Sequence, residues 1–402
     1  MISHGKPVRV SGLGCVTAAG RNLAACLTAL DEGWRSPRPP ELFPAERQFP
    51  VFACDLNMSD NPFCLSDPAV FKAMSRTVHL AAHAVAEALN DAALEIEDLA
   101  SLRVGVCIGT SVGTSLEFYD YYRCYRAGKE DPLDVIHRYL SSNPALALAR
   151  LLGTRGPIQT VTNACSSGAD AIGLAADWIR NGLCDIAICG GADALCQIIY
   201  YGFASLQLQS AAACMPFDKK RAGLNLGEGA GIMVLESTER RKNRKTQGFI
   251  RGYGTCTDGY HLTAPHPNTR GLRTALKHAL TQAGALCGDI AFINAHGTAT
   301  PTNDAAEGAF FRELFPNTPF IATKGSTGHT LGAAGAVEAV FTLAHLIRGK
   351  LPASPGFFEE DPALGISPIN KPLQVEARLA MTQSIAFGGN NSILLLGTEN
   401  TA

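Results

Sequence analysis

The chain has few charged residues and no extended apolar segment. Charged residues make up 17% of its 402 positions, and the formal net charge is −2. A charge this close to zero argues against nucleic acid as the main partner. No apolar run in the sequence approaches the ~18 residues that cross a bilayer, and the N-terminus shows no apolar signal core. We therefore expect a cytoplasmic protein that binds neither nucleic acid nor membrane.

The chain also lacks the cysteine spacing of a zinc site. It contains 13 cysteines, an odd number, and none of them forms a C-x-x-C pair. This spacing weakens both a zinc-site and a disulfide-framework interpretation. We expect most of these thiols to lie in the core as small hydrophobic side chains, in a reducing compartment. We expect no bound metal.

Short β-branched runs alternate along the chain with alanine-rich segments. Strands interleaved with helices indicate βαβ units around a largely parallel, buried sheet. Hydrophobic residues make up 46% of the chain, which is ample for a large core. The expected strands are 8–13, 104–108, 158–162, 186–190, 232–236, 249–254, 291–295, 320–323 and 393–397, and the expected helices are 75–90, 167–181, 269–283, 302–314 and 333–348.

Two of the expected helices are similar to each other. One opens at Gly168 and ends at Gly182, and the other opens at Gly335 and ends at Gly349. Each follows a strand and a polar turn. Small-residue helices often look alike, so a chance similarity stays open. The sharper interpretation is a chain of two similar halves, 1–245 and 246–402, joined at its most charged segment.

A single cysteine stands at a junction between a β-branched run and a helix of small residues. This residue, Cys165, lies within Thr160–Ala171. A thiol at the start of a helix lies at the positive end of the helix dipole, which favours the nucleophilic thiolate. A thiol held in this way can accept an acyl group.

Two histidines follow in similar settings. His296 lies within Phe292–Asp304, and His329 lies within Lys324–Gly335. In each segment a strand leads into a Gly/Thr-rich turn, which lets the backbone approach a ligand. A lone histidine in such a turn is more often structural, but two of them together with the thiol favour a catalytic site. The turn Ser384–Asn391 offers further N–H groups that are suited to an oxyanion.

These segments together resemble the β-ketoacyl-[acyl-carrier-protein] synthases, the condensing enzymes with one Cys and two His. The match runs over nearly the whole length, and the order of its segments makes it specific. The resemblance implies a thiolase-like α/β fold in five layers, α-β-α-β-α, with two similar halves. It rests on Ala164–Gly168, Phe217-Asp218, Leu226–Gly231, Ala295–Thr298, Lys324–Gly335 and Phe387–Gly389.

The resemblance also implies a reaction. Cys165 would take an acyl group from an acyl carrier protein. A malonyl carrier thioester would then lose CO₂ and attack that acyl group, which extends the chain by two carbons. His296 and His329 would stabilise the enolate, and Lys324 and Glu338 would hold the second histidine. An ordinary buried ion pair is the alternative for the last two residues.

Further roles come from the same resemblance. The backbone N–H groups of Cys165 and Phe387 would form a second oxyanion hole, and Phe387 would be the aromatic gate. Thr298 and Thr300 would contact the phosphopantetheine arm, and Val112 would line the acyl pocket. No cofactor is expected, because the substrates travel on the phosphopantetheine of the carrier.

The gate also departs from the family pattern. Ile385-Ala386 stand where Phe-Gly is frequent, and Asn390 stands where Thr or His is common. Gate motion and substrate choice therefore stay open.

Acyl carrier proteins are acidic, so their docking face should be basic. Lys72 and Arg76 are four residues apart in an expected helical segment and would share one face. Lys219, Lys220 and Arg221 form a second candidate patch. A solvated surface is the alternative for either cluster.

Several alternatives stay open at this point. The enzyme could be a homodimer, or the active half of a heterodimer with a related chain-length factor. Its pathway could make fatty acids, or polyketides such as aryl polyenes, which the short segment Leu206–Phe217 favours. A non-catalytic chain-length factor would lack Cys165. Thiolases use a second cysteine late in the chain, whereas the last one here is Cys287. A Cys-His hydrolase has no specific support.

Overall fold

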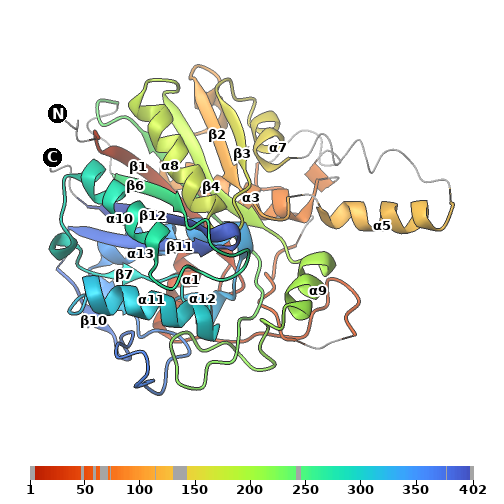
Figure 1. The fold of residues 1–402 in the computed structure, drawn as a ribbon. Helices are drawn as coiled ribbons and strands as arrows, with labels where there is room; N and C mark the ends of the chain where they lie inside the picture. Colours follow the sequence, from red (N-terminus) through yellow and green to blue (C-terminus); the bar gives the residue numbers. More distant parts are fainter. Residues whose placement is uncertain are drawn as a thin grey trace.

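Figure 1 shows the fold of the chain as a computed structural model. The structure describes residues 5–46, 49–57, 60–63, 71–72, 74–113, 115–129, 143–240, 246–376 and 378–398. The two termini lie near each other on one side of the molecule. Helix α5 (Ser115–Arg126) projects from the body on the opposite side.

The strands follow the expected runs. Most are longer than expected, whereas the strands at the far edge of the second half are only two residues long. The described strands are β1 (Val8–Thr17), β2 (Val104–Gly109), β3 (Ile158–Val161), β4 (Ile186–Asp193), β5 (Gly229–Glu236), β6 (Gly248–Thr257), β7 (Ile293–Asn294), β8 (Phe320–Ile321), β9 (Lys350–Leu351), β10 (Leu373–Gln374), β11 (Leu379–Ala386) and β12 (Asn390–Gly397).

All five expected helices are present, each within one residue of the expected bounds. They are α3 (Arg76–Asp91), α8 (Ser167–Arg180), α10 (Arg270–Ala283), α11 (Pro301–Leu314) and α13 (Ala334–Arg348). The remaining described helices are α1 (Leu23–Asp31), α4 (Ile96–Leu99), α7 (Pro144–Leu151), α9 (Gln197–Ser205) and α12 (Lys324–Thr327), with the 3₁₀ turns η1 (Cys287–Asp289), η2 (Leu331–Ala333) and η3 (Phe387–Gly389).

Ten strands form one continuous sheet in the order β3-β2-β4-β5-β1-β6-β12-β11-β7-β8. Parallel pairing joins β2 to β3 and β4, and β7 to β8 and β11. The other neighbours in this sheet are antiparallel. The expectation of a largely parallel sheet is therefore wrong. Antiparallel neighbours need no helical crossover, and β11 is followed directly by β12 through the short turn η3.

The strand order is the same in the two halves of the sheet. From the edge to the centre, the first half runs β3-β2-β4-β5-β1 and the second half runs β8-β7-β11-β12-β6. The halves meet where β1 pairs with β6. The chain passes from one half to the other between Glu236 and Gly248. The proposed join at 245/246 adjoins residues 241–245, which lie outside the described residues, so the division stays a prediction.

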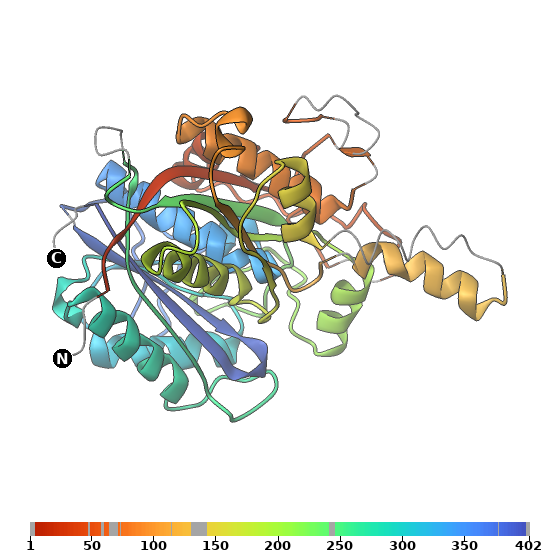
Figure 2. The same cartoon turned by 90° about the horizontal axis from the view of Figure 1, so that it is seen from above.

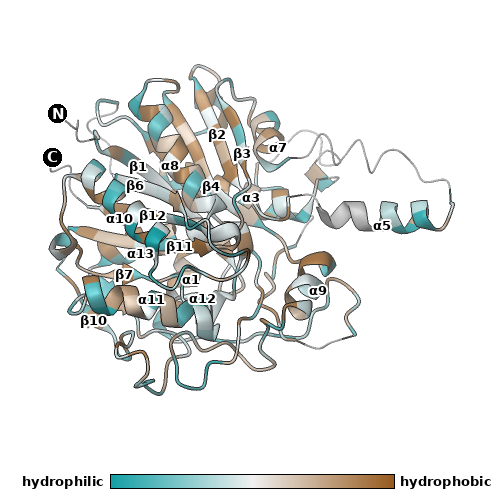
Figure 3. Cartoon of the chain, in the orientation of Figure 1, coloured by the Kyte–Doolittle hydropathy of each residue, from teal (hydrophilic) through white to brown (hydrophobic). Residues whose placement is uncertain are grey.

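The helices complete five layers (Figure 2). Helix α3 packs on β1 and β5 on one outer face, and α10 packs on β6 and β12 on the other. Between the two halves of the sheet lie α8, against β2 and β4, and α13, against β5 and β11. Figure 3 shows β2 and β4 largely in the hydrophobic colours, because helices cover both of their faces.

Small residues allow α8 and α13 to touch at the centre. A Cβ atom on Gly168 would come within 2.8 Å of the Ala336 Cβ, and one on Gly335 within 2.9 Å of the Ala169 Cβ. Real side chains do not approach so closely, so glycine is required at both positions. The contact is reciprocal, as expected for two halves related by approximate twofold symmetry. The glycine that opens each helix therefore has a packing role.

One described helical stretch, Leu331–Arg348, is long and apolar enough to cross a membrane by length and composition. It is the central helix α13 with the preceding turn, and 89% of that stretch is buried inside the protein. The expectation that no segment reaches this length did not hold, because the centre of a five-layer fold needs an apolar helix.

Candidate active site

The cysteine turn joins β3 to α8. Ala164, immediately before Cys165, adopts the left-handed conformation with φ of 49°. Ser167 Oγ accepts a hydrogen bond from the Asn163 N–H at 2.7 Å and donates one to the Ala164 carbonyl at 2.6 Å. These bonds close the turn over the start of α8 and hold Cys165 at that helix end.

The two histidines lie on turns of the second half. The backbone N–H of His296 donates to the buried Glu307 carboxylate at 2.6 Å. The backbone N–H of His329 donates to the Asn225 carbonyl at 2.8 Å, and its carbonyl accepts from the Gly227 N–H at 2.9 Å. The Leu226–Gly231 segment of the first half therefore fixes the position of the second histidine.

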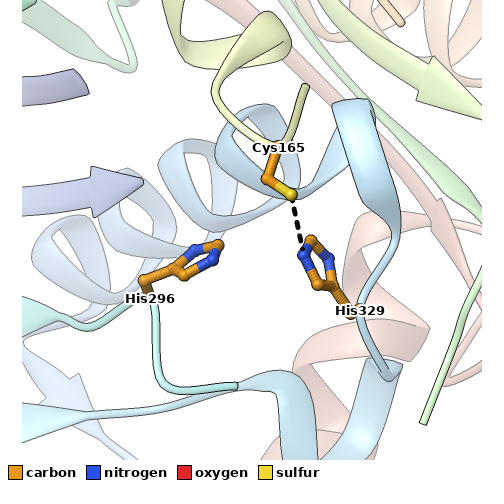
Figure 4. Close-up of side chains that lie close together, drawn as sticks. All are labelled: Cys165, His296 and His329. Atoms are coloured by element: carbon orange, nitrogen blue, oxygen red, sulfur yellow. Dashed lines mark hydrogen bonds between the residues drawn. The ribbon is translucent and has the colours of Figure 1, made fainter. Parts of the chain in front are cut away.

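Figure 4 shows both rings beside the sulfur. His329 Nε2 lies 3.1 Å from Cys165 Sγ, and the centroids of the two imidazoles are 5.3 Å apart at an interplanar angle of 87°. All three side chains are buried. Cys165 and His329 are 164 positions apart in the sequence, and they converge with His296 on one point.

Hydrogen bonds fix the tautomer of both rings. Lys324 Nζ lies 3.2 Å from His296 Nδ1, and the Leu331 N–H donates to His329 Nδ1 at 3.2 Å. Because each Nδ1 accepts a proton donor, each Nε2 carries the ring proton. Both histidines therefore present an N–H to the site.

Lys324 connects His296 to a buried carboxylate. Its ammonium group bonds to Glu338 Oε1, to the His296 carbonyl and to His296 Nδ1. Three acceptors match the three N–H bonds of an ammonium. Burial raises the pKa of Glu338 to about 7, although Lys324 opposes that rise. Lys324 and Glu338 form a buried ion pair, and Lys324 also bonds directly to His296. The expectation that this pair would hold His329 is therefore wrong.

The three side chains are close enough to be considered as metal ligands, with ligand atoms within 4.8 Å of one another. Their chemistry does not fit this role. A protonated Nε2 has no lone pair to give, and the Lys324 ammonium beside His296 repels a cation. The set is arranged to donate hydrogen bonds to an anion.

The electrostatics of the thiol differ from the sequence expectation. Burial raises the pKa of Cys165 to about 11, while the Lys324 charge and the Phe387 N–H act in the opposite direction. A thiol with this pKa is protonated at neutral pH in the resting enzyme. Burial, followed by the charge of Lys324, holds the pKa of His296 and of His329 well below the usual value, and both rings stay neutral.

A cavity of about 160 Å³ adjoins the three side chains. Phe387 covers it on one side, and its ring stacks on Phe203 with centroids 5.4 Å apart. The cavity is lined by Cys165, Phe203, Leu208, Leu224, Thr263, Ala264, Pro265, His296, Thr298, Thr300, Pro301, Thr302, Asn303, His329, Ile385, Ala386 and Phe387.

The expected pantetheine and pocket residues fall in different places. Thr298 and Thr300 line the cavity, and their hydroxyl oxygens are 2.9 Å apart. Val112 is buried in a small core with Phe203 and Leu331 and does not line the cavity. Its role in the acyl pocket therefore stays a prediction.

Sequence reasoning missed Asp193. This fully buried carboxylate accepts hydrogen bonds from the N–H groups of Ser111, Val112 and Gly332. It thereby ties the turn after β2 to the turn that carries His329. Its position after the Gly-Gly pair at the end of β4 was the available signal, because strand ends in such sheets carry site residues.

The expected docking residues do not share a helix face. Ser75 caps α3, so Lys72 lies before that helix and Arg76 is its first residue. Arg76 is paired with the buried Glu228, and its side chain is 16% exposed. The expected shared helix face is therefore wrong, and Arg76 neutralises a buried carboxylate. Lys72 is exposed, and its role stays a prediction.

Two carboxylates offset most of the positive charge of the second candidate patch. Lys219 and Lys220 both pair with Glu359, and Arg221 pairs with Asp361. The patch therefore presents much less positive charge than its sequence suggests.

Comparison with known proteins identifies the chain. The β-ketoacyl synthase N-terminal domain matches residues 5–241, and the β-ketoacyl synthase C-terminal domain matches residues 247–357. The chain belongs to the β-ketoacyl synthase family. It is an acyl-transferring condensing enzyme with a thiolase-like α/β fold, which confirms the family, the fold class and the enzyme class expected from the sequence.

Relatives cover nearly all of the chain. The "3-oxoacyl-[acyl-carrier-protein] synthase 2" of Synechocystis sp. is 34% identical over 97% of each chain. A chain of "The ishigamide ketosynthase/chain length factor" is 30% identical, with a TM-score of 0.91 over 98% of this chain and 100% of that chain. A chain of "Ketosynthase (ApeO) in Complex with its Chain Length Factor (ApeC) from Xenorhabdus doucetiae" is 30% identical, with a TM-score of 0.83 over 98% of each chain.

Proposed function

We propose that this ketoacyl synthase condenses a malonyl group with an acyl group held on Cys165, both delivered by an acyl carrier protein. One observation carries the proposal. The sulfur of Cys165 and the rings of His296 and His329 meet at one cavity, and both rings present Nε2–H. This arrangement matches a nucleophile that faces two donors for a developing oxyanion.

The first step is a thioester exchange. Cys165 Sγ attacks the acyl thioester, the new S–acyl bond forms, and the carrier thiol leaves with the proton that Cys165 gives up. The Phe387 N–H already bonds to this sulfur and supports the charge that develops there. Because the resting thiol is protonated, ionisation must accompany substrate binding, with Lys324 supplying the favourable charge.

The second step makes the carbon–carbon bond. The malonyl carboxylate leaves as CO₂, and its bonding electrons pass to the thioester as an enolate. The Nε2–H groups of His296 and His329 stabilise the enolate oxygen. The enolate carbon then attacks the acyl carbonyl, the bond to Cys165 breaks, and the released thiolate takes a proton from water. No step needs a metal or a redox cofactor, since the departure of CO₂ drives the reaction.

The test is acyl loading of the purified enzyme. An acyl carrier thioester should add one acyl group to the wild-type chain, as read by intact mass, and Cys165→Ala should abolish that addition. Cys287→Ala is a matched control at a partly buried thiol and should load normally. Persistent loading of Cys165→Ala at another residue would reject the assignment.

We further infer that this chain is the catalytic subunit of a heterodimer with a related chain-length factor. Two structural relatives carry ketosynthase/chain length factor titles, and Cys165, His296 and His329 are all present here. Strand β3 ends the sheet, and Ile158 on it is 40% exposed. Among the described residues no strand pairs with its outer edge, which a partner could therefore use. The same proposal includes a pathway that makes specialised polyketides. It also includes a cytoplasmic location, because free thiols favour a reducing compartment.

Oligomeric state tests this second proposal. Co-expression with a related ketosynthase-like chain that lacks the cysteine should give a one-to-one complex by native mass spectrometry. A stable homodimer that excludes the other chain would favour the homodimer instead.

A further inference from the structure

A partly buried hydrogen-bond network reaches the cysteine turn from the second half of the chain. Tyr253 lies on β6, and its hydroxyl donates to Asp170 Oδ1 on α8 at 2.9 Å. The other carboxylate oxygen of Asp170 accepts from Asn163 Nδ2 at 2.6 Å and from Ser166 Oγ at 2.8 Å. Asn163 and Ser166 stand on either side of Cys165, so the network brackets the nucleophile.

The packing fixes Tyr253 in this position. Its ring lies against Gly173 of α8, where an added Cβ would come within 2.4 Å of the ring. Its backbone N–H donates to Gln282 Oε1 on α10 at 2.8 Å. Burial and the charge of Asp170 raise the pKa of the Tyr253 hydroxyl, which therefore stays a donor.

The cysteine turn needs such support. Ala164 holds a left-handed conformation that costs free energy for a residue with a Cβ atom, and such residues persist only where their surroundings fix them. Asp170 is 7% exposed, so its charge requires partners, and three donors supply them. A hydrogen bond to a buried charge is stronger than one between neutral groups.

We propose that Tyr253 and Asp170 are positioning residues, through which the second half of the chain holds the Cys165 turn in the geometry that acyl loading needs. This inference rests on the proposed role of Cys165 as the acyl acceptor. Neither residue lines the cavity, so both act through Asn163 and Ser166. The histidines are held by other partners, Glu307, Lys324 and Asn225, and do not depend on this network.

If Tyr253 and Asp170 position only the Cys165 turn, a change in either residue should slow acyl loading and leave malonyl decarboxylation unaffected. Tyr253→Phe removes one oxygen and keeps the ring on Gly173, and we expect acyl loading from a small pantetheine thioester to slow by roughly tenfold, within the range that misplaced reactants cause. In a Cys165→Ala background, the same change should leave CO₂ release from a malonyl thioester within twofold. Loading is read by intact mass under single-turnover conditions.

Further variants sharpen the test. Asp170→Asn should slow loading at least as much as Tyr253→Phe, and the double variant should be no slower than Asp170→Asn alone, because both act through one bond. Tyr201→Phe removes a hydroxyl that accepts from the Glu46 N–H at 2.9 Å and should stay within twofold of wild type. If Asp170→Asn does not fold, Tyr253→Phe carries the test alone.

Iodoacetamide labelling separates this inference from the proposed function. Alkylation of Cys165 needs no carrier and no acyl transfer, and Tyr253→Phe should change its rate at least threefold. An unchanged alkylation rate, or equal loss of loading and CO₂ release, would overturn the positioning role. A wild-type chain that alkylates but never acylates Cys165 would instead overturn the proposed function.

Discussion

The cysteine turn of the first half and the histidine turn of the second half occupy equivalent places in the fold. Each precedes a central small-residue helix, α8 or α13, and each contains a residue in the left-handed conformation, Ala164 with φ of 49° and Leu331 with φ of 54°. Their surroundings differ. The cysteine turn is held by neutral serine bonds and one carboxylate, whereas the histidine turns are surrounded by buried charges.

This difference teaches how one scaffold supports two kinds of chemistry. Beside the histidines, burial and then the charge of the Lys324 ammonium lower the pKa of the rings, so they remain neutral donors. The same ammonium favours the ionised form of Cys165 across the site. One buried cation therefore serves both halves, and the comparison can be tested by changing each half separately.

The largest effect is expected from a change to Lys324, whose charge acts on residues of both halves. Lys324→Met would leave Glu338 buried without its partner, which typically costs about 3–5 kcal/mol of unfolding free energy. Lys324→Met/Glu338→Gln should recover part of that stability but not the activity. Urea denaturation measures the loss. A single variant that is as stable as wild type would show that the pair is not a structural centre of the second half.

The next largest effect is expected from removing one of the two Nε2–H donors. His329→Ala should slow malonyl decarboxylation by about 10²–10³, the usual effect of losing an oxyanion donor, and should slow acyl loading much less. CO₂ release and intact mass measure the two half-reactions. The exposed His278 on α10 offers His278→Ala as a control with no expected effect. If His329→Ala slowed acyl loading and decarboxylation equally, the proposed division of roles between the two halves would be contradicted.

A pH series tests the state of the thiol. Because burial raises the pKa of Cys165 to about 11, the thiolate fraction rises with pH throughout the range below that value. Alkylation of Cys165 should therefore accelerate about tenfold per pH unit between about pH 7 and 9. The neutral histidines add no titration there, since their pKa values lie well below the usual value. A rate that is already level at pH 7 would indicate a preformed thiolate.

The smallest effect concerns the surface of the first half. Lys72→Glu should raise KM for a carrier-bound substrate about two- to fivefold, as expected for one rim charge, and should leave KM for a small pantetheine thioester unchanged. Lys277→Glu, at an exposed lysine on α10 of the second half, is the matched control. Equal changes with both substrates, or an equal effect of Lys277→Glu, would reject Lys72 as a docking residue.

The comparison also shows where sequence reasoning reached its limit. The helix bounds were predictable because alanine-rich, periodic segments and their caps are local signals. The strand directions were not, since pairing depends on which distant segment lies alongside. Arg76 looked like a docking charge because its partner Glu228 is 152 positions away. Asp193 was missed for the same reason, because its donors come from both halves.

The sequence by itself determined the reactive side chains, the turns that carry them and the small residues that let α8 and α13 meet, because each of these is encoded locally. Only the tertiary structure decided the protonation of the site. Burial keeps the thiol neutral at rest, the Lys324 ammonium 28 positions away bonds to Nδ1 of His296, and Tyr253 reaches across from β6 to the cysteine turn. Desolvation and long-range hydrogen bonds depend on the assembled core, and no stretch of sequence contains them.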